Sequence, residues 1–352
     1  QTFHIAADEP AQLAIARWLS GGTRWNMFDH STWRPGMATL MVPLFWITDD
    51  TATIMRGGLL IAAALGGVGA VVLARLAARI TPMTPLACVL SAGVVALAPS
   101  SLSATAFVWA EGLVTVTFLG SLALVIAFYD HGRHSAGIAA IVLSVVGFTA
   151  HGRLLPMVAV VAVLVIGRSV VERRWKQALT FCLVAGGWAV LGAGYATWIF
   201  RNVWDEPGSS NTVGTVMKRL PNVTDNVQSA IGQTWYQLVA TAGLFGIGGA
   251  ALARAAVRRR PRPTGTLDVD VEIDLAEALS PLPPFVAPVV SPRHARLVLA
   301  CTVPLVGVSM VFMSGRTRSD HRIYGRYNDA VLWPLLIVAI AWLVELRRAH
   351  RP

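Results

Sequence analysis

The chain has 352 residues, of which 55% are hydrophobic and only 14% are charged. A soluble domain usually carries about 25% charged residues, and the mean hydropathy of this chain is +0.58. These values exclude an ordinary soluble domain and predict an all-helical protein that crosses a membrane several times. The net charge of +10 then reflects arginine and lysine in cytoplasmic loops, and no nucleic-acid partner is expected.

Residues 1–53 precede the first long apolar run and predict an external loop with two short helices. The first helix, DEPAQLAIARWL, has a capping acid at Asp8 or Glu9, a proline in its first turn and an apolar stripe at helical spacing. The second follows Pro35 with the run GMATLMVPLFWI. Because a membrane span takes about 20 residues, both helices are expected to lie in the plane of the membrane surface.

Nine apolar segments follow and are predicted to span the membrane. They lie near 54–79, 84–100, 104–129, 136–150, 154–168, 178–200, 236–257, 296–314 and 328–346. The residues His-Gly-Arg at 151–153 interrupt the pair around 136–168, which is therefore either two short helices or one bent hairpin. The chain begins at Gln1 without a signal peptide, so a further helix before this residue, and ten spans in all, are expected.

The distribution of arginine and lysine sets the expected orientation, because cytoplasmic loops are rich in both. The basic set comprises Arg75, Arg79, Arg133, Arg168, Arg173, Arg174, Lys176, Arg254, Arg258, Arg259, Arg260, Arg262, Arg293, Arg296, Arg347, Arg348 and Arg351. The opposite set is expected to face outward and comprises 1–53, 100–104, 151–153, 201–235 and 315–327. The cytoplasmic connection 258–295 has the composition of a disordered linker, and it separates the helices of 54–257 from the last two in 296–352.

The external loops carry the candidate binding residues. Loop 315–327 is rich in arginine although external loops are normally poor in it, and guanidinium groups bind phosphate through paired hydrogen bonds. The candidates for binding a phosphate or a sugar are Arg316, Arg318, Arg322, Arg326, Tyr324 and Tyr327, with His151 and Arg153 of the earlier turn. The alternatives are a basic loop that faces lipid headgroups and an arginine that snorkels at 153. Loop 201–235, with Asp205 and Glu206, is long enough to act as a lid or to recognise an acceptor.

Glu111 is the only carboxylate well inside a predicted span, and it is expected to form an ion pair at the end of its helix. No pair of histidines has the spacing of metal ligands, and no cofactor is expected. A divalent cation shared by His4 and Asp8 is conceivable but is not indicated. The three cysteines all lie in apolar runs, so neither a disulfide framework nor a cysteine metal site is expected.

The order of elements in residues 7–56 resembles the first external loop of the GT-C glycosyltransferases. An acidic pair at Asp8 and Glu9 opens an interfacial helix that ends in GG, and the W-x-P sequence at 33–35 leads into a second short helix with the run PLFW. The GT-C superfamily includes protein O-mannosyltransferases and the lipid A aminoarabinose transferase. The late GRY sequence, which contains Arg326 and Tyr327, is similar to an Arg-Tyr pattern of the same family.

This resemblance implies an enzyme with a GT-C-like helical bundle. It would be an inverting transferase that moves a mannose- or arabinose-like sugar from a polyprenyl phosphate to an acceptor hydroxyl outside the membrane. Asp8 would act as the base, with Glu9 beside it, although either could merely cap the helix. The implied partners are a polyprenyl-phosphate-linked sugar, membrane lipids and an unknown hydroxyl acceptor. The bias toward Ala, Val, Gly and Arg is typical of GC-rich bacteria, so the expected location is a bacterial cytoplasmic membrane.

Two other classes of protein fit the same composition. A lipid or small-molecule transporter would place polar groups near the membrane midplane, often in broken helices. A non-catalytic membrane scaffold would leave the external carboxylates and arginines without a common site.

Overall fold

The computed structural model describes residues 8–24, 34–204, 212–258, 289–314 and 326–349, and all regular elements within these ranges are helices. The first half contains α1 (Asp8–Leu19), α2 (Gly36–Ile47), α3 (Thr51–Ile80), α4 (Pro85–Ala96), α5 (Pro99–Thr105), α6 (Glu111–His131), α7 (His134–Ala150) and the short 3-10 helix η1 (Gly152–Leu154). The second half contains α8 (Leu155–Val171), α9 (Trp175–Val203), α10 (Thr212–Arg219), α11 (Val223–Ala240), α12 (Leu244–Val257), α14 (Pro292–Met313) and α16 (Arg326–Ala349).

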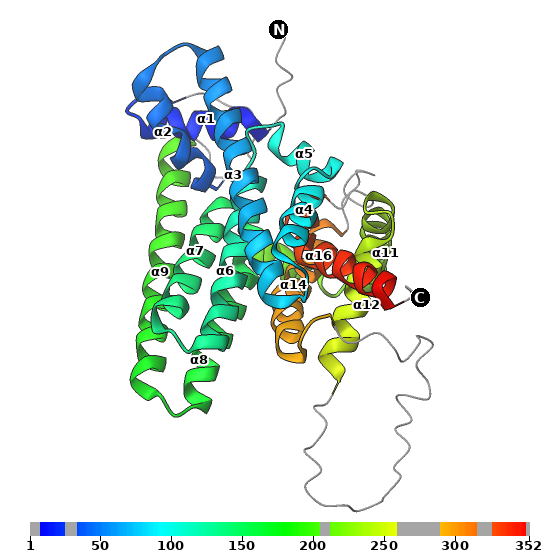
Figure 1. The fold of residues 1–352 in the computed structure, drawn as a ribbon. Coiled ribbons are helices and arrows are strands. Elements are labelled where there is room, and N and C mark those ends of the chain that lie inside the picture. The colour runs from blue at the N-terminus through cyan, green and yellow to red at the C-terminus, as the bar shows by residue number, and fades with distance from the viewer. Residues whose placement is uncertain (1–7, 25–33, 205–211, 259–288, 315–325, 350–352) are drawn as a thin grey trace, which may run out of the picture.

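The two short helices predicted for the first segment are confirmed as α1 and α2. The apolar stripe of α1 is buried, with Ala11, Ala14 and Ile15 at 1% exposure or less. The two helices pack on each other, and the side chain of Gln12 accepts a hydrogen bond from the backbone N–H of Ala38 at 3.1 Å. In Figure 1 this pair lies across the upper ends of α3 and α9.

The prediction of nine spans is not confirmed in the part of the chain that the structure describes. Six helices there are long and apolar enough to cross a membrane, or seven if the bent pair α11–α12 counts as one span. The segment predicted at 84–100 is divided, because prolines at 85 and 99 each begin a separate short helix. α7 is also apolar but has 17 residues, and it is joined to α8 through η1. The interruption at 151–153 thus separates two helices, which resolves the alternative left open above.

The predicted loop 201–235 is largely helical, which corrects both that loop and the span at 236–257. α10 and α11 occupy most of the loop, and α11 meets α12 at an angle of 108°. The bend follows from left-handed backbone at Ala242 and Gly243, with φ of 48° and 82°. Figure 1 shows α11 nearly end-on, whereas α12 runs down the page. The linker predicted at 258–295 ends earlier than expected, because α14 begins at Pro292, and residues 259–288 lie outside the described ranges.

Helix α6 lies at the centre of the bundle. It packs against α3, α7, α8, α14 and α16, and its side chains are buried on all sides, as expected for a helix that is apolar all round. Figure 1 shows α3 and α6–α9 side by side, with α16 running obliquely beside this group, next to α4, α12 and α14. We call the end of this bundle that carries α1, α2, η1 and the start of α6 the α1 end, and the end that carries the α8–α9 connection the opposite end. Six or more apolar helices of spanning length indicate an integral membrane protein.

Candidate functional site

The site begins with Glu9, the second residue of α1. Its side chain is fully buried, and its Oε1 accepts a hydrogen bond from the backbone N–H of Val108 at 2.8 Å. This bond joins the start of α1 to the segment that leads into α6. Asp8 precedes Glu9 as the first residue of the same helix, so its backbone lies at this junction, while its side chain is outside the described part of the structure.

A buried ion pair lies at the start of α6. The Nη2 atom of Arg153 is 3.7 Å from Oε1 of Glu111, and these two residues are each 6% exposed. The distance exceeds that of a normal hydrogen bond, so the attraction is chiefly between charges. The prediction that Glu111 pairs at its helix end is confirmed.

The turn at η1 fixes the position of Arg153. His151 ends α7 with extended backbone, and its Nδ1 accepts a hydrogen bond from the backbone N–H of Arg153 at 3.2 Å. This bond caps the short helix that carries the arginine. The turn therefore brings two predicted phosphate-binding residues, His151 and Arg153, to the same end of the bundle as Glu9.

Arg34 is a further cation at the α1 end that the sequence analysis missed. Its guanidinium lies 4.3 Å from the ring centroid of Phe148 in the last turn of α7, and burial lowers its pKa from the ordinary value. Its position is fixed by Gly36, where an added Cβ would lie 2.6 Å from the backbone nitrogen of Ala150. The only feature of the sequence that could have indicated this position is that Arg34 is a basic residue directly before Pro35. Arg34 thus contacts Phe148, which precedes the turn at 151–153 by three residues, and therefore lies close to that turn.

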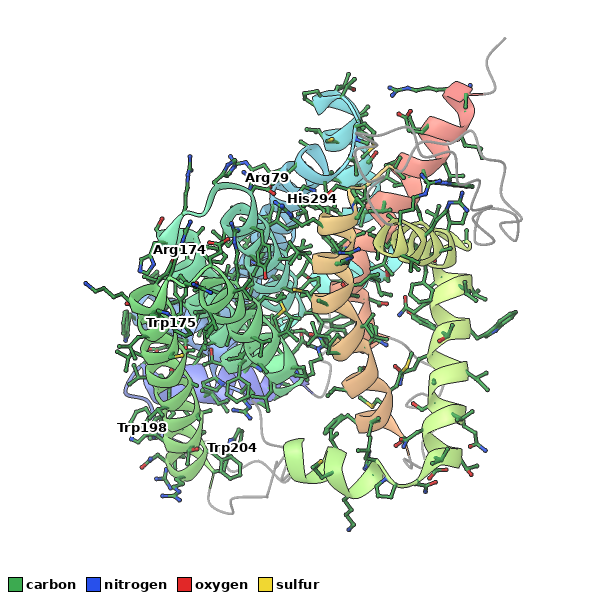
Figure 2. The ribbon with its side chains drawn as sticks, turned by 90° about the horizontal axis from the view of Figure 1, so that it is seen from below. Arg79, Arg174, Trp175, Trp198, Trp204 and His294 are labelled. Carbon is green, nitrogen blue, oxygen red and sulfur yellow. The ribbon has the colours of Figure 1, made fainter. Side chains whose placement is uncertain are left out.

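Aromatic side chains surround this end. Phe107 and Trp109 stack with ring centroids 4.3 Å apart, directly beside the Val108 amide that Glu9 holds. Trp18 of α1 lies 5.1 Å from Trp198 of α9, which Figure 2 labels near the end of that helix. Aromatic rings therefore lie beside the buried charged groups of the α1 end.

The other predicted site residues are only partly described. Arg326 and Tyr327 form the start of α16, with their side chains outside the described part. The remaining candidates, Arg316, Arg318, Arg322, Tyr324, Asp205 and Glu206, lie outside the described residues, as does His4. Their roles stay predictions. The segment 315–325 joins the end of α14 to the start of α16, and α14 contacts η1.

Within the described residues, no three His, Cys, Asp or Glu side chains gather in a way that would hold a metal ion. The charged side chains described at the α1 end include the carboxylates of Glu9 and Glu111 and the guanidinium groups of Arg34 and Arg153. Such a set can accept a proton from a hydroxyl group and can neutralise a phosphate.

The opposite end also carries charged residues, but in a different setting. Asp130 lies between Arg79 and His294. Its Oδ2 is 3.8 Å from Nε of Arg79, and its Oδ1 is 3.0 Å from Nε2 of His294. Figure 2 looks onto this end and shows Arg79 and His294 close together, with Arg174 and Trp175 further along the edge. Arg168 and Arg293 also reach this end, where they donate hydrogen bonds to the carbonyl oxygens of Phe128 and Tyr129. Both arginines belong to the predicted cytoplasmic set.

Comparison of the chain with protein-family models, with curated proteins and with solved structures gave no match.

Proposed function

We propose that the protein is an inverting glycosyltransferase that moves a sugar from a polyprenyl phosphate to an acceptor hydroxyl at the α1 end. The observation that supports the proposal most is that this end joins the start of α1, with Asp8 and Glu9, to the buried pair of Glu111 and Arg153. Carboxylates and guanidinium groups from segments far apart in the sequence thus lie at one end of the bundle. A charged residue placed so close to hydrocarbon is costly and usually has a function.

The proposed reaction is a single displacement. The acceptor hydroxyl loses its proton to the carboxylate of Asp8, and its oxygen forms a bond with the anomeric carbon of the sugar. The bond between that carbon and the phosphate oxygen breaks, and the electron pair leaves with the lipid phosphate. Guanidinium groups stabilise the charge of the leaving phosphate, and Arg153 and Arg34 are the described candidates for this role.

In this proposal Glu9 has a positioning role. Its carboxylate holds the Val108 amide, which lies three residues before Glu111. It therefore fixes the start of α1, and with it Asp8, against the start of α6. In the proposal Asp8 is therefore the base, and Glu9 holds α1 in place.

The test uses the full chain in lipid nanodiscs with a panel of polyprenyl phosphate sugars. The wild type is expected to consume one of them. Asp8→Asn is expected to lower turnover by about 10²–10⁴-fold, the usual contribution of a general base, while the donor still binds. Glu9→Gln keeps a carbonyl oxygen that can accept the hydrogen bond of the Val108 amide, so its turnover is expected to fall much less than that of Asp8→Asn. Full turnover by Asp8→Asn would contradict the assignment.

A second candidate function is transport of a lipid or small molecule. The observation in its favour is the 108° bend between α11 and α12, because broken helices often line transport sites. Reconstitution in liposomes separates the two functions. A transporter moves a labelled lipid between leaflets without changing it, whereas the transferase releases free polyprenyl phosphate.

A further inference from the structure

Helix α11 has its polar face toward the protein and its apolar face outward. The exposed large apolar side chains recur every four residues and are Val223, Val227, Ile231, Trp235 and Val239. The buried side chains have the same spacing, and Ser229, Gln233 and Gln237 are each exposed by 3% or less. In a membrane this pattern is typical of a helix whose outer face meets lipid while its inner face lines a polar site.

The buried face of α11 forms a chain of hydrogen bonds with α14 and α16. Ser229 Oγ donates to the carbonyl oxygen of Met310 in the last turn of α14, at 2.9 Å. Gln233 Nε2 donates to Ser229 Oγ at 3.0 Å, and Gln233 Oε1 accepts from Nδ2 of Asn328 at 2.8 Å. Polar atoms of three helices thus meet inside the protein.

A second bond extends the same cluster by one turn. Gln237 Nε2 donates to Oδ1 of Asp329, the residue that follows Asn328, at 2.9 Å. We call the amide side chains of Gln233, Gln237 and Asn328, together with the carboxylate of Asp329, the amide cluster. Because α14 runs from His294 at the opposite end toward η1, its last turn, and hence this cluster, lies toward the α1 end.

The cluster has hydrogen-bonding capacity to spare. Asn328 is 1% exposed, and within the described part of the chain its Oδ1 has no hydrogen-bond partner. On α14, the hydroxyl groups of Thr302 and Ser309 are also buried and lack a partner among the described residues. Buried polar atoms are normally paired, and most strictly so where lipid excludes water. The unpaired Oδ1 of Asn328, whose Nδ2 is already bonded to Gln233, therefore indicates a ligand that donates a hydrogen bond to it.

The chemistry of the cluster selects the class of ligand. Amide groups both donate and accept hydrogen bonds, as the neighbouring hydroxyl groups of a sugar do. A phosphate would require cations, and an alkyl chain would leave Oδ1 of Asn328 unpaired. We propose that the amide cluster binds the hydroxyl groups of a sugar ring. The source of this sugar, either the lipid-linked donor or an acceptor glycan, rests on the proposed function above.

In this proposal a ligand reaches the cluster beside α11. α11 presents its large apolar side chains outward, so its inward contact with α14 and α16 depends on the polar bonds described. Its far end leads into the bend at Ala242 and Gly243. Hydroxyl groups of a sugar can replace the bonds between the amides one for one, with little change in the number of hydrogen bonds.

The test is the double variant Gln233→Leu/Asn328→Leu in the full chain in nanodiscs. Replacing both residues with apolar ones of similar size removes both sides of their hydrogen bond, and Ser229 keeps its bond to the carbonyl oxygen of Met310, so folding is expected to be kept. Dissociation constants are measured for a polyprenyl phosphate mannose, for the same polyprenyl phosphate without sugar and for an alkyl mannoside without phosphate. The double variant is expected to bind one sugar probe about tenfold more weakly, the loss of one to two neutral hydrogen bonds, and to bind the sugar-free lipid unchanged.

The arms separate the sources of the sugar. A loss confined to the polyprenyl phosphate mannose places the donor sugar at the cluster, and a loss confined to the alkyl mannoside places an acceptor glycan there. The matched control is Gln228→Leu, which changes an exposed glutamine of the same helix and is expected to leave all three constants unchanged.

Several results would overturn the proposal. In the first, the double variant binds both sugar probes as the wild type does. In the second, it binds all three probes equally weakly and unfolds at a lower temperature. In the third, the wild type binds neither sugar probe. The proposed transfer reaction can fail separately. In that case the wild type binds a sugar probe through the cluster but never consumes a donor.

Discussion

The two ends of the helical bundle both carry ion pairs, but the pairs differ in burial. At the α1 end, Glu111 and Arg153 are 3.7 Å apart, and both side chains are less than 10% exposed. At the opposite end, Arg168 and Glu172 are only 2.6 Å apart, yet their side chains are 19% and 30% exposed. The shorter pair is thus the one that water can reach.

This difference shows that distance alone is a poor guide to the importance of an ion pair. An exposed pair contributes about 0–1 kcal/mol, because water solvates the separated charges almost as well. Breaking a buried pair costs about 3–5 kcal/mol, because the remaining charge stays in a poor solvent. The buried pair at the α1 end therefore has the greater energetic consequence, and such a pair is kept in a membrane protein chiefly for function.

The largest expected effect is that of removing one charge from the buried pair. Glu111→Gln leaves the guanidinium of Arg153 beside a neutral amide. The variant is expected to lose about 3–5 kcal/mol of unfolding free energy. Thermal unfolding in nanodiscs measures this loss, and Arg153→Met in the same background is expected to recover part of it because both charges are then absent.

The matched control lies at the opposite end. Glu172→Gln removes the carboxylate of the exposed pair and is expected to cost less than about 1 kcal/mol. An equal loss for Glu111→Gln and Glu172→Gln would remove the distinction between the two ends.

A smaller effect is expected from the close packing of α2 on α7. Gly36→Ala places a Cβ 2.6 Å from the backbone nitrogen of Ala150, and backbone cannot yield as a flexible side chain does. The expected cost is about 1–3 kcal/mol. The control toward the opposite end is Gly167→Ala on α8, where the added Cβ meets nothing within 4 Å. It should keep or slightly raise stability, since alanine favours helix by up to about 1 kcal/mol over glycine.

Unfolding temperatures of the two glycine variants, recorded side by side, check this prediction. If Gly36→Ala proves as stable as Gly167→Ala, the helices α2 and α7 are not in backbone contact. The position assigned to Arg34 beside Phe148 would then be wrong as well.

The smallest effect concerns pH at the opposite end. The hydrogen bond from Arg168 Nε holds the pKa of Glu172 below its ordinary value of 4.5. A carboxylate with a lowered pKa in the folded protein stabilises it above the unfolded pKa, and this contribution disappears as pH falls through the folded pKa. At neutral pH the wild type should therefore unfold at a slightly higher temperature than Glu172→Gln, by at most about 2 °C. The difference should vanish once the pH falls below the lowered pKa of Glu172 in the folded protein. A difference that grew in acid would have the opposite sign and would contradict the assignment.

The amino-acid sequence alone determined the class of the protein and its most regular parts. Apolar runs can be recognised directly in the sequence, so the long helices α3, α8, α9, α14 and α16 were located within a few residues. The predicted span for α6 ended close to the end of the helix but began seven residues too early, because the segment directly before Glu111 is also apolar. The short helices α1 and α2 were also recognised, because their prolines and caps are local signals. The pairing of Glu111 followed from the cost of an isolated charge near hydrocarbon.

Tertiary structure alone decided which residues meet. The sequence of α11 contains asparagine, glutamine, serine and threonine and therefore resembles a loop. It forms a helix because Gln233 and Gln237 find buried partners on α16, about 90 residues further along the chain. The partner of Glu9 was equally hidden, since Val108 offers only a backbone amide, which every residue except proline possesses. Local patterns report how a residue prefers to fold, whereas the partners of buried polar groups depend on how distant helices pack.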